Sequence, residues 1–260
     1  MRKIEITADR LVSSLLALAK NKNIAILDSC GVGSGGSNFL IAGVDAVEVC
    51  EITNDDAAET LAIFHQKLGR KDRAAIFTIS YDFGLKLQNI KRELEPSSEP
   101  DIYIASYDCL IIHNYDDGRT FLSGNPDVFD PIESALFDSG PHELHIAFSP
   151  PPRATVRSNF TQTAYLTAIQ NIKERIRSGD TYQTNLTQQL TAELSGDLTG
   201  VEVFRRLRRD HPASFAAYID RESSSVVSAS PELFLRVSKD HNGNSKITSS
   251  PIKGTRRRGK

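Results

Sequence analysis

Apolar residues recur at helical spacing in two separate parts of the chain. Residues 9–20, DRLVSSLLALAK, place their leucines on one side of a helix. Residues 159–180 carry one apolar stripe, made of Tyr165, Ile169, Ile172 and Ile176. Ser158 or Asn159 is the predicted N-cap of this second helix, and Gly179 is its predicted stop. Both segments are therefore predicted to be amphipathic helices.

Further helices and many strands are predicted from the remaining pattern. Residues 55–69 are predicted to be helical, with Asn54 as N-cap and Gly69 near the end, and residues 201–210 form a shorter helix. The strand-like runs are residues 24–30, 38–52, 74–80, 102–123, 214–220, 225–238 and 246–254. Within the fourth run, Asp117-Gly118 is a hairpin signal.

Residues 181–194, TYQTNLTQQLTAEL, alternate strictly between apolar and polar residues and are predicted to be a strand. The apolar face comprises Tyr182, Leu186, Leu190 and Ala192, and it is expected to join a core. The opposite face comprises Gln183, Asn185, Thr187 and Gln189. The pattern is equally compatible with a polar face that lines a pocket and with one that faces water.

A proline-rich stretch divides the pattern into two units. Residues 1–138 read as a mixed α+β domain. Residues 139–158 contain three consecutive prolines, which favour a stiff, extended linker. Residues 159–260 then read as a helix followed by antiparallel strands, which suggests a second α+β unit with sheet packed against helices.

Composition excludes several classes of protein. Hydrophobic residues make up 39% of the chain, charged residues 25%, and the net charge is −2, as in ordinary soluble proteins that do not bind nucleic acid. Three cysteines are too few for a disulfide framework. No apolar run of membrane length occurs, and the start MRKIEITADR lacks a signal-peptide core. We therefore expect a cytoplasmic protein that contacts neither membrane nor nucleic acid.

Four short motifs match known patterns in unfavourable surroundings. GVGSGG at residues 31–36 fits the dinucleotide fingerprint, but a strand-like run follows where a helix is needed. SPIK at residues 250–253 fits a serine-lysine pair, but its proline and the next glycine oppose a helix. HELH at residues 142–145 lacks zinc-helix spacing. RRLRR at residues 205–209 is predicted to be the solvent-facing side of a helix.

Four longer stretches, in order, resemble one family: IRSGDTYQTNLTQQL, HPASFAAYI, SASPELFLRV and SPIKGTRRRG. They resemble the chorismate-utilising enzymes, specifically the large subunit shared by anthranilate synthase and aminodeoxychorismate synthase. AILDSC and ISYDFG in the N-terminal half resemble segments of the same subunits, so the likeness covers essentially the whole chain. It implies an α+β fold in which two large antiparallel sheets pack face to face with helices outside.

Two positions discriminate within this family. Isochorismate and salicylate synthases carry a water-activating lysine where this chain has Gln183, whose amide cannot act as a base. Anthranilate synthases typically read PIAGT where this chain reads PIKGT, with Lys253, as aminodeoxychorismate synthases do. The resemblance thus implies Lys253 as the nucleophile that attacks chorismate on the way to 4-amino-4-deoxychorismate, a precursor of p-aminobenzoate and folate. The substrate-binding residues that it implies are Gln183, Glu232, Gly254 and Thr255.

The resemblance also implies a tryptophan pocket formed by two stretches distant in sequence. Its expected residues are Leu27, Asp28 and Ser29 from the first stretch and Pro212, Ser214 and Phe215 from the second. The second stretch departs from the family pattern, because His211 and Ala213 stand where asparagine and serine are usual. These departures bear directly on whether tryptophan binds.

Members of this family continue well beyond a length of 260 residues, and that continuation carries the Mg²⁺ ligands. We therefore expect this chain to be an N-terminal fragment that is inactive alone, with its Mg²⁺ ligands outside it. The expected partner is a glutamine amidotransferase that delivers ammonia. Two alternatives remain: component I of anthranilate synthase, in tryptophan biosynthesis, and a non-catalytic tryptophan-binding remnant.

Overall fold

The computed structural model describes residues 1–33, 37–90, 99–139, 155–193 and 198–252. Unit 1 combines Met1–Leu144 with Thr199–Lys260, and unit 2 is His145–Leu198. In the described part of the chain, no helix has both the length and the apolar character needed to cross a membrane.

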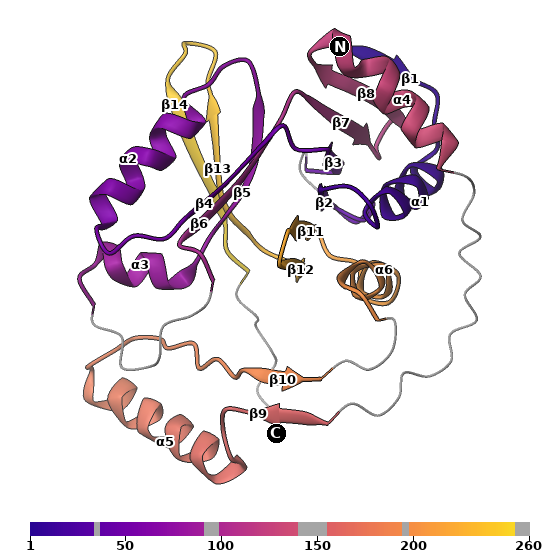
Figure 1. Cartoon of the computed structure of the whole chain (residues 1–260). Coiled ribbons are helices and arrows are strands. Elements are labelled where there is room, and N and C mark those ends of the chain that lie inside the picture. The colour runs from indigo at the N-terminus through magenta and orange to yellow at the C-terminus, as the bar shows by residue number, and fades with distance from the viewer. Residues whose placement is uncertain (34–36, 91–98, 140–154, 194–197, 253–260) are drawn as a thin grey trace. The chain divides into compact units, whose positions relative to one another are not determined.

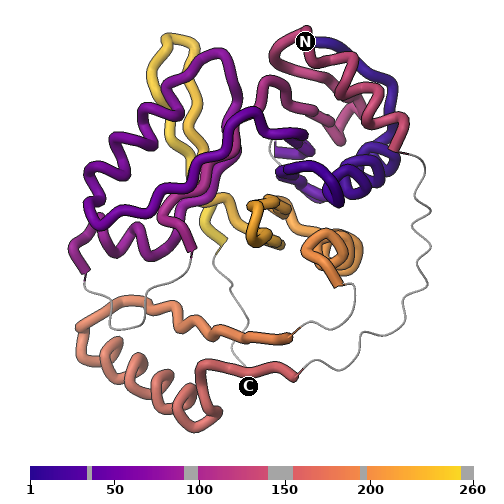
Figure 2. The backbone as a smooth tube through the Cα atoms, viewed as in Figure 1, coloured from indigo at the N-terminus to yellow at the C-terminus, as the bar shows by residue number. Residues whose placement is uncertain are grey.

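A seven-stranded antiparallel sheet is the centre of unit 1. Its strands, in spatial order, are β1 (Arg2–Ile4), β8 (Arg119–Gly124), β7 (Cys109–Asn114), β3 (Phe39–Val44), β2 (Ile24–Asp28), β11 (Phe215–Arg221) and β12 (Ser224–Ser230). Strand β11 pairs with β2, so a late segment completes a sheet that the N-terminal segment begins (Figure 2). This pairing differs from the predicted succession of one unit over 1–138 and another over 159–260.

Three helices cover one face of this sheet. They are α1 (Ala8–Leu18), α4 (Phe129–Asp138), which follows a short 3-10 turn η1 (Pro126–Val128), and α6 (Gly200–Asp210). Helix α1 packs beside α4, and α6 packs on β11 and β12 (Figure 1). The core between helices and sheet includes the fully buried Leu11, Ile26, Leu40 and Phe204. The predicted apolar stripe of residues 9–20 is therefore confirmed as the buried face of α1.

A three-stranded antiparallel sheet faces the other side of the seven-stranded sheet. It consists of β4 (Glu48–Ile52), β6 (Ile102–Tyr107) and β5 (Ala74–Ile79). One of its faces packs with α2 (Ala57–Leu68) and α3 (Tyr81–Leu87), through a core that includes Phe83 and Phe64. Its other face contributes Tyr103 and Tyr107 to a second core with Ala25 and Ile219. The expected arrangement of sheets packed face to face with outer helices is confirmed.

Two long strand-like runs are in fact pairs of strands that belong to different sheets. Residues 38–52 break between β3 and β4, where Asp45 takes a positive φ of 55°. Residues 225–238 break at Pro231 and Glu232, between β12 and β13 (Leu233–Lys239). Strand β13 pairs with β14 (Ser245–Ser250) as a separate hairpin.

Unit 2 contains α5 (Gln162–Ser178) and two short paired strands, β9 (Val156–Ser158) and β10 (Leu190–Ala192). The predicted strand over 181–194 is confirmed only at β10. Tyr182 is 94% exposed, so the expected core face of that strand does not form in the described residues.

The predicted helix ends are confirmed more closely than the starts. Gly69 and Gly179 are the C-caps of α2 and α5, and Gly179 has the left-handed φ of 85° that favours glycine. Helix α2 is capped by Asp56 rather than Asn54, because the Asn54 side chain accepts a bond from the Asp56 backbone instead. Helix α5 is capped by Thr161, not by Ser158 or Asn159.

His113 on β7 gives unit 1 a specific sensitivity to acid. Its ring is 1% exposed and lies 2.8 Å from Thr120 Oγ1, and burial lowers its pKa although Asp28 and Asp117 act in the opposite direction. The unfolded chain therefore binds the proton first, and stability is lost as the pH falls below the ordinary histidine pKa of about 6.5. We expect His113→Gln to reduce the slope of unfolding free energy against pH between about 7 and 5. Equal slopes in urea titrations of both proteins would contradict this.

Candidate functional site: a cavity between β11 and β13

The floor of one cavity in unit 1 is a face of the seven-stranded sheet. Leu27 on β2 lies opposite Ile41 on β3 and Ala217 on β11, so the three side chains share a face. Phe39 and Phe215, each two residues along its strand, extend this apolar floor. The cavity has a volume of about 370 Å³, within the range of small-molecule sites.

Strand β13 and three serines complete the lining. Leu233 and Arg236 of β13 lie along the cavity, and the Arg236 guanidinium donates to Ser37 Oγ. Ser29 Oγ donates to Asn38 Oδ1 at 2.9 Å, and Ser214 Oγ donates to the carbonyl of Val32 at 3.3 Å. The hydroxyl groups of the lining are thus held in place by the protein itself.

The structure brings together most residues of the expected tryptophan pocket. Five of the six line this cavity: Leu27, Asp28, Ser29, Ser214 and Phe215. The antiparallel pairing of β2 with β11 explains this, because it sets Asp28 opposite Ala216. Pro212 is not among the lining residues.

The carboxylate of Asp28, however, lies on the opposite face of the sheet. The side chains of a strand alternate, so Asp28 points to the helix-covered side while Leu27 points into the cavity. There Arg208 Nε of α6 donates to Asp28 Oδ2 at 2.7 Å, and the hydroxyl of Tyr115 donates to Oδ1 at 2.8 Å. The backbone N–H of Cys30 also donates to Oδ1, at 2.7 Å. The Asp28 side chain is fully buried and fully engaged.

The pKa values of Tyr115 and Arg208 are shifted in this network. Burial, followed by the charge of Asp28, raises the pKa of the Tyr115 hydroxyl. Burial lowers the pKa of Arg208, but the charge of Asp28 and the hydrogen bond to it outweigh this, and the net shift is upward. Tyr115 therefore stays neutral and Arg208 stays charged.

Arg208 is a residue that sequence reasoning missed. The prediction of a solvent-facing RRLRR segment is wrong for Arg205 and Arg208, whose side chains are 13% and 21% exposed. It is right for Arg209, which is 51% exposed. Val201 and Phe204 are buried on α6, and Arg208 follows at the next helical interval on the same stripe. This helical spacing could have indicated from the sequence that Arg208 lies on the buried side of α6.

Of the residues expected to act on chorismate, the structure describes Gln183 and Glu232. Lys253, Gly254 and Thr255 lie outside the described residues. Gln183 is exposed in an irregular segment of unit 2, and Glu232 lies between β12 and β13 in unit 1. Their roles stay predictions. Among the described residues, no three His, Cys, Asp or Glu side chains gather as metal ligands do.

The structure describes only part of the four short motifs named in the sequence analysis. The GVGSGG segment is followed by strand β3, which supports the prediction against a dinucleotide site, although residues 34–36 lie outside the described residues. Residues 142–145 and Lys253 of the SPIK motif lie outside them too.

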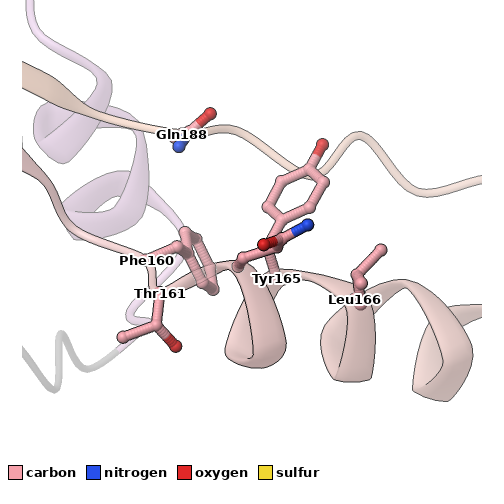
Figure 3. Close-up of a pocket in the computed structure, with 6 residues that line it drawn as sticks. Phe160, Thr161, Tyr165, Leu166 and Gln188 are labelled. Carbon is pink, nitrogen blue, oxygen red and sulfur yellow. The ribbon is translucent and has the colours of Figure 1, made fainter.

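A second cavity, of about 270 Å³, lies in unit 2. Figure 3 shows Phe160, Tyr165 and Leu166 along α5 and its N-terminus, with Gln188 from the segment before β10. The rings of Phe160 and Tyr165 meet edge to face, with centroids 5.6 Å apart. This cavity has no charged lining residue and none of the predicted site residues, so it offers little to fix a polar substrate.

Relatives with two activities resemble the chain. It is 28% identical over 282 residues to "Anthranilate synthase component 1 3" of Haloarcula marismortui. The alignment covers 97% of this chain and 55% of that protein. It is 30% identical over 186 residues to "Aminodeoxychorismate synthase component 1" of Escherichia coli K12, covering 70% of this chain and 38% of the relative. "Aminodeoxychorismate synthase component 1" of Bacillus subtilis is 26% identical to the chain. That alignment covers 72% of this chain and 40% of the relative.

The fold resembles that of a solved relative. Anthranilate synthase component I from Streptococcus pneumoniae superimposes with a TM-score of 0.60 at 17% identity, over 79% of this chain and 53% of that one. The chain thus spans about half the length of the relatives it matches. The family described as chorismate binding enzyme matches residues 33–260. This chain is therefore a member of the chorismate binding enzyme family.

Proposed function

We propose that the chain is part of component 1 of an aminodeoxychorismate synthase. In this proposal, chorismate and ammonia derived from glutamine give 4-amino-4-deoxychorismate and water, for p-aminobenzoate and folate synthesis. The observation that carries it is Lys253 in the sequence PIKGT, at the position where anthranilate synthases typically have alanine. Relatives from Escherichia coli and Bacillus subtilis that bear the name of this enzyme support it.

The proposed chemistry uses the amine of Lys253 as a temporary substituent of the ring. The neutral amine forms a bond to C2 of chorismate, the two ring double bonds each shift by one position, to C1=C6 and C4=C5, and the 4-hydroxyl leaves with a proton from the amine as water. Ammonia then attacks C4, both double bonds shift back, and the lysine leaves C2 as the free amine, with the proton that ammonia gives up. The amine must be unprotonated, and the positive charges of Arg256, Arg257 and Arg258, next in sequence, favour the neutral form.

Magnesium and a glutamine amidotransferase belong to the same proposal. The described residues provide no set of ligands that fits Mg²⁺, so we assign this chain no step that uses the ion. The amidotransferase would supply ammonia, and ammonium salt can replace it in an assay.

Component 1 of an anthranilate synthase is the second candidate. Its support is coverage: a 26% identical "Anthranilate synthase component 1" of Lactococcus lactis covers 100% of this chain. The reactions differ in their products, because anthranilate formation releases pyruvate whereas 4-amino-4-deoxychorismate keeps the enolpyruvyl group. A non-catalytic, tryptophan-binding role is the third candidate, and absence of any turnover would favour it.

The test is product analysis with the full product of the gene that encodes this chain. With chorismate, Mg²⁺ and ammonium, we expect a product that keeps the enolpyruvyl group by mass spectrometry, without pyruvate release. Lys253→Ala should lower turnover by about a hundredfold or more, because the group acts directly on the substrate. Lys239→Ala, on the exposed end of β13, is the control and should retain full turnover.

Each contrary outcome has a definite meaning. Anthranilate with stoichiometric pyruvate would replace the first candidate by the second. Full turnover by Lys253→Ala would contradict the role of the lysine while leaving the family assignment intact.

A further inference from the structure

The three-stranded sheet of unit 1 has two edges of opposite character. Strand β4, at one edge, carries Glu48 and Glu51, and charged side chains on an edge strand discourage pairing with another chain. Strand β5, at the other edge, reads AAIFTI and contains no charged residue, proline or glycine. Among the described residues, β5 pairs with β6 alone. Its outer edge is therefore open to pairing with a further strand.

Large apolar side chains are exposed along this open edge. Phe77 and Ile79 of β5 are 40% and 50% exposed, and Tyr81, at the start of α3, is 85% exposed. Single exposed apolar residues are common, but several together beside an unpaired strand mark a surface that contacts another protein.

Helix α2 extends the apolar surface beyond the strand. The ring of Phe64 meets that of Phe77 edge to face, with centroids 5.0 Å apart. Leu61 and Leu68 lie three residues before and four residues after Phe64, so they share its side of the helix, and they are 42% and 39% exposed. Lys67, on the opposite flank of the helix, reaches β4 instead. The flank of α2 beside β5 is therefore the apolar one.

The charges around β5 fit a second copy of the chain in antiparallel orientation. The chain enters β5 through Arg70, Lys71 and Arg73, and Asp82 follows in the first turn of α3. Two antiparallel β5 strands place the basic start of each beside the acidic end of the other. Arg70 and Arg73 also form ion pairs within the chain, so we assign the exposed Lys71 to this contact. Helix α2 likewise has an acidic first turn and a basic last turn, which suits antiparallel packing.

We propose that two copies of the protein form a two-fold dimer through β5 and the apolar flank of α2. The strands pair antiparallel, which joins three strands from each copy into one sheet, and the two α2 helices pack together on the same side of it. Paired six-residue strands alone fall short of the roughly 1,200 Å² from which specific interfaces start, so the helix flank is needed as well. The proposal does not rest on the proposed amination activity.

Sedimentation velocity over a concentration series tests this dimer, using the full product of the gene that encodes this chain. We expect a reversible equilibrium between monomer and dimer. Ile79→Lys places a cation on the open edge and should raise the dissociation constant of the dimer at least tenfold, because a two-fold interface contains every substitution twice. Lys71→Glu should raise it less, and its effect should shrink at high salt, because it changes an exposed charge.

Controls separate loss of the interface from loss of the fold. Val47→Lys makes the same kind of change at a position that is 46% exposed beside β4, and it should leave the dissociation constant unchanged. Circular dichroism checks that each variant folds. Hydrogen exchange adds the location: the amides of residues 74–79 should exchange more slowly at dimer-forming concentrations, whereas those of β4 should not change.

Two results would overturn the proposal. One is a monomer at every concentration; if Ile79→Lys then abolished binding of a glutamine amidotransferase, the edge would belong to that partner instead. The other is a dimer that Ile79→Lys leaves intact, which would place the interface on another surface. Neither result depends on the product formed from chorismate, so this proposal and the proposed function can fail separately.

Discussion

Replacing Arg208 by methionine is expected to lower the free energy of unfolding by about 3–5 kcal/mol. The substitution removes the cation from Asp28, whose side chain is fully buried, and leaves a carboxylate without charge compensation. The hydroxyl of Tyr115 and the N–H of Cys30 would remain as its donors. A loss of this size is a large part of the about 5–15 kcal/mol that holds a typical domain folded. Urea unfolding followed by circular dichroism measures it.

Matched variants show whether the buried pair is the cause. Arg209→Met changes the neighbouring arginine, whose partner Asp210 is about half exposed, and should cost at most about 1 kcal/mol. Adding Asp28→Asn to Arg208→Met should restore part of the lost stability, since it removes the stranded charge. A double variant less stable than Arg208→Met alone would contradict this explanation.

The substitution Gly43→Ala is expected to lower the free energy of unfolding by about 1–3 kcal/mol through overpacking. A Cβ atom on Gly43 would lie 2.6 Å from three ring atoms of Tyr107, which is 1% exposed between the two sheets. The ring cannot move aside easily, because its hydroxyl bonds to Asn23 at 3.4 Å and its neighbours are buried.

A second glycine provides the control for this prediction. Gly84 in α3 has no heavy atom within 4 Å of the Cβ position, so Gly84→Ala should be neutral or stabilising by up to about 1 kcal/mol. In a double-mutant cycle, Gly43→Ala should cost less when Tyr107 is replaced by leucine. An equal cost in both backgrounds would show that the ring is not the obstacle.

Local patterns predicted the elements well because local forces decide them. The apolar stripe of residues 9–20 and the stop at Gly179 depend on neighbours within one or two turns, and both are confirmed. The Asp117-Gly118 turn likewise joins β7 to β8 as predicted. The predicted strand over 181–194 is confirmed only at β10, where β9 pairs with it, because alternation alone supplies no partner for the rest.

Partnerships distant in sequence were not accessible to such patterns. Nothing within residues 38–52 tells that β3 and β4 join different sheets. The proximity of Leu27 and Phe215 was expected only from the family resemblance, and the pairing of β2 with β11 that produces it was not predicted. Arg208 was missed because a charged residue on a helix is usually solvated, and its partner Asp28 lies 180 positions away.

The pairing of β2 with β11 also has a consequence during synthesis on the ribosome. Strand β2 ends at Asp28 and β11 begins at Phe215, so β2 has no neighbour on that side until the later strand emerges. At about 5–20 residues per second, the roughly 190 residues between them take about 10–40 seconds to appear. Throughout this interval the nascent chain exposes the unpaired, apolar edge of β2 and an Asp28 without its Arg208 partner. We expect a chaperone that holds unfolded chains to bind this edge during the interval.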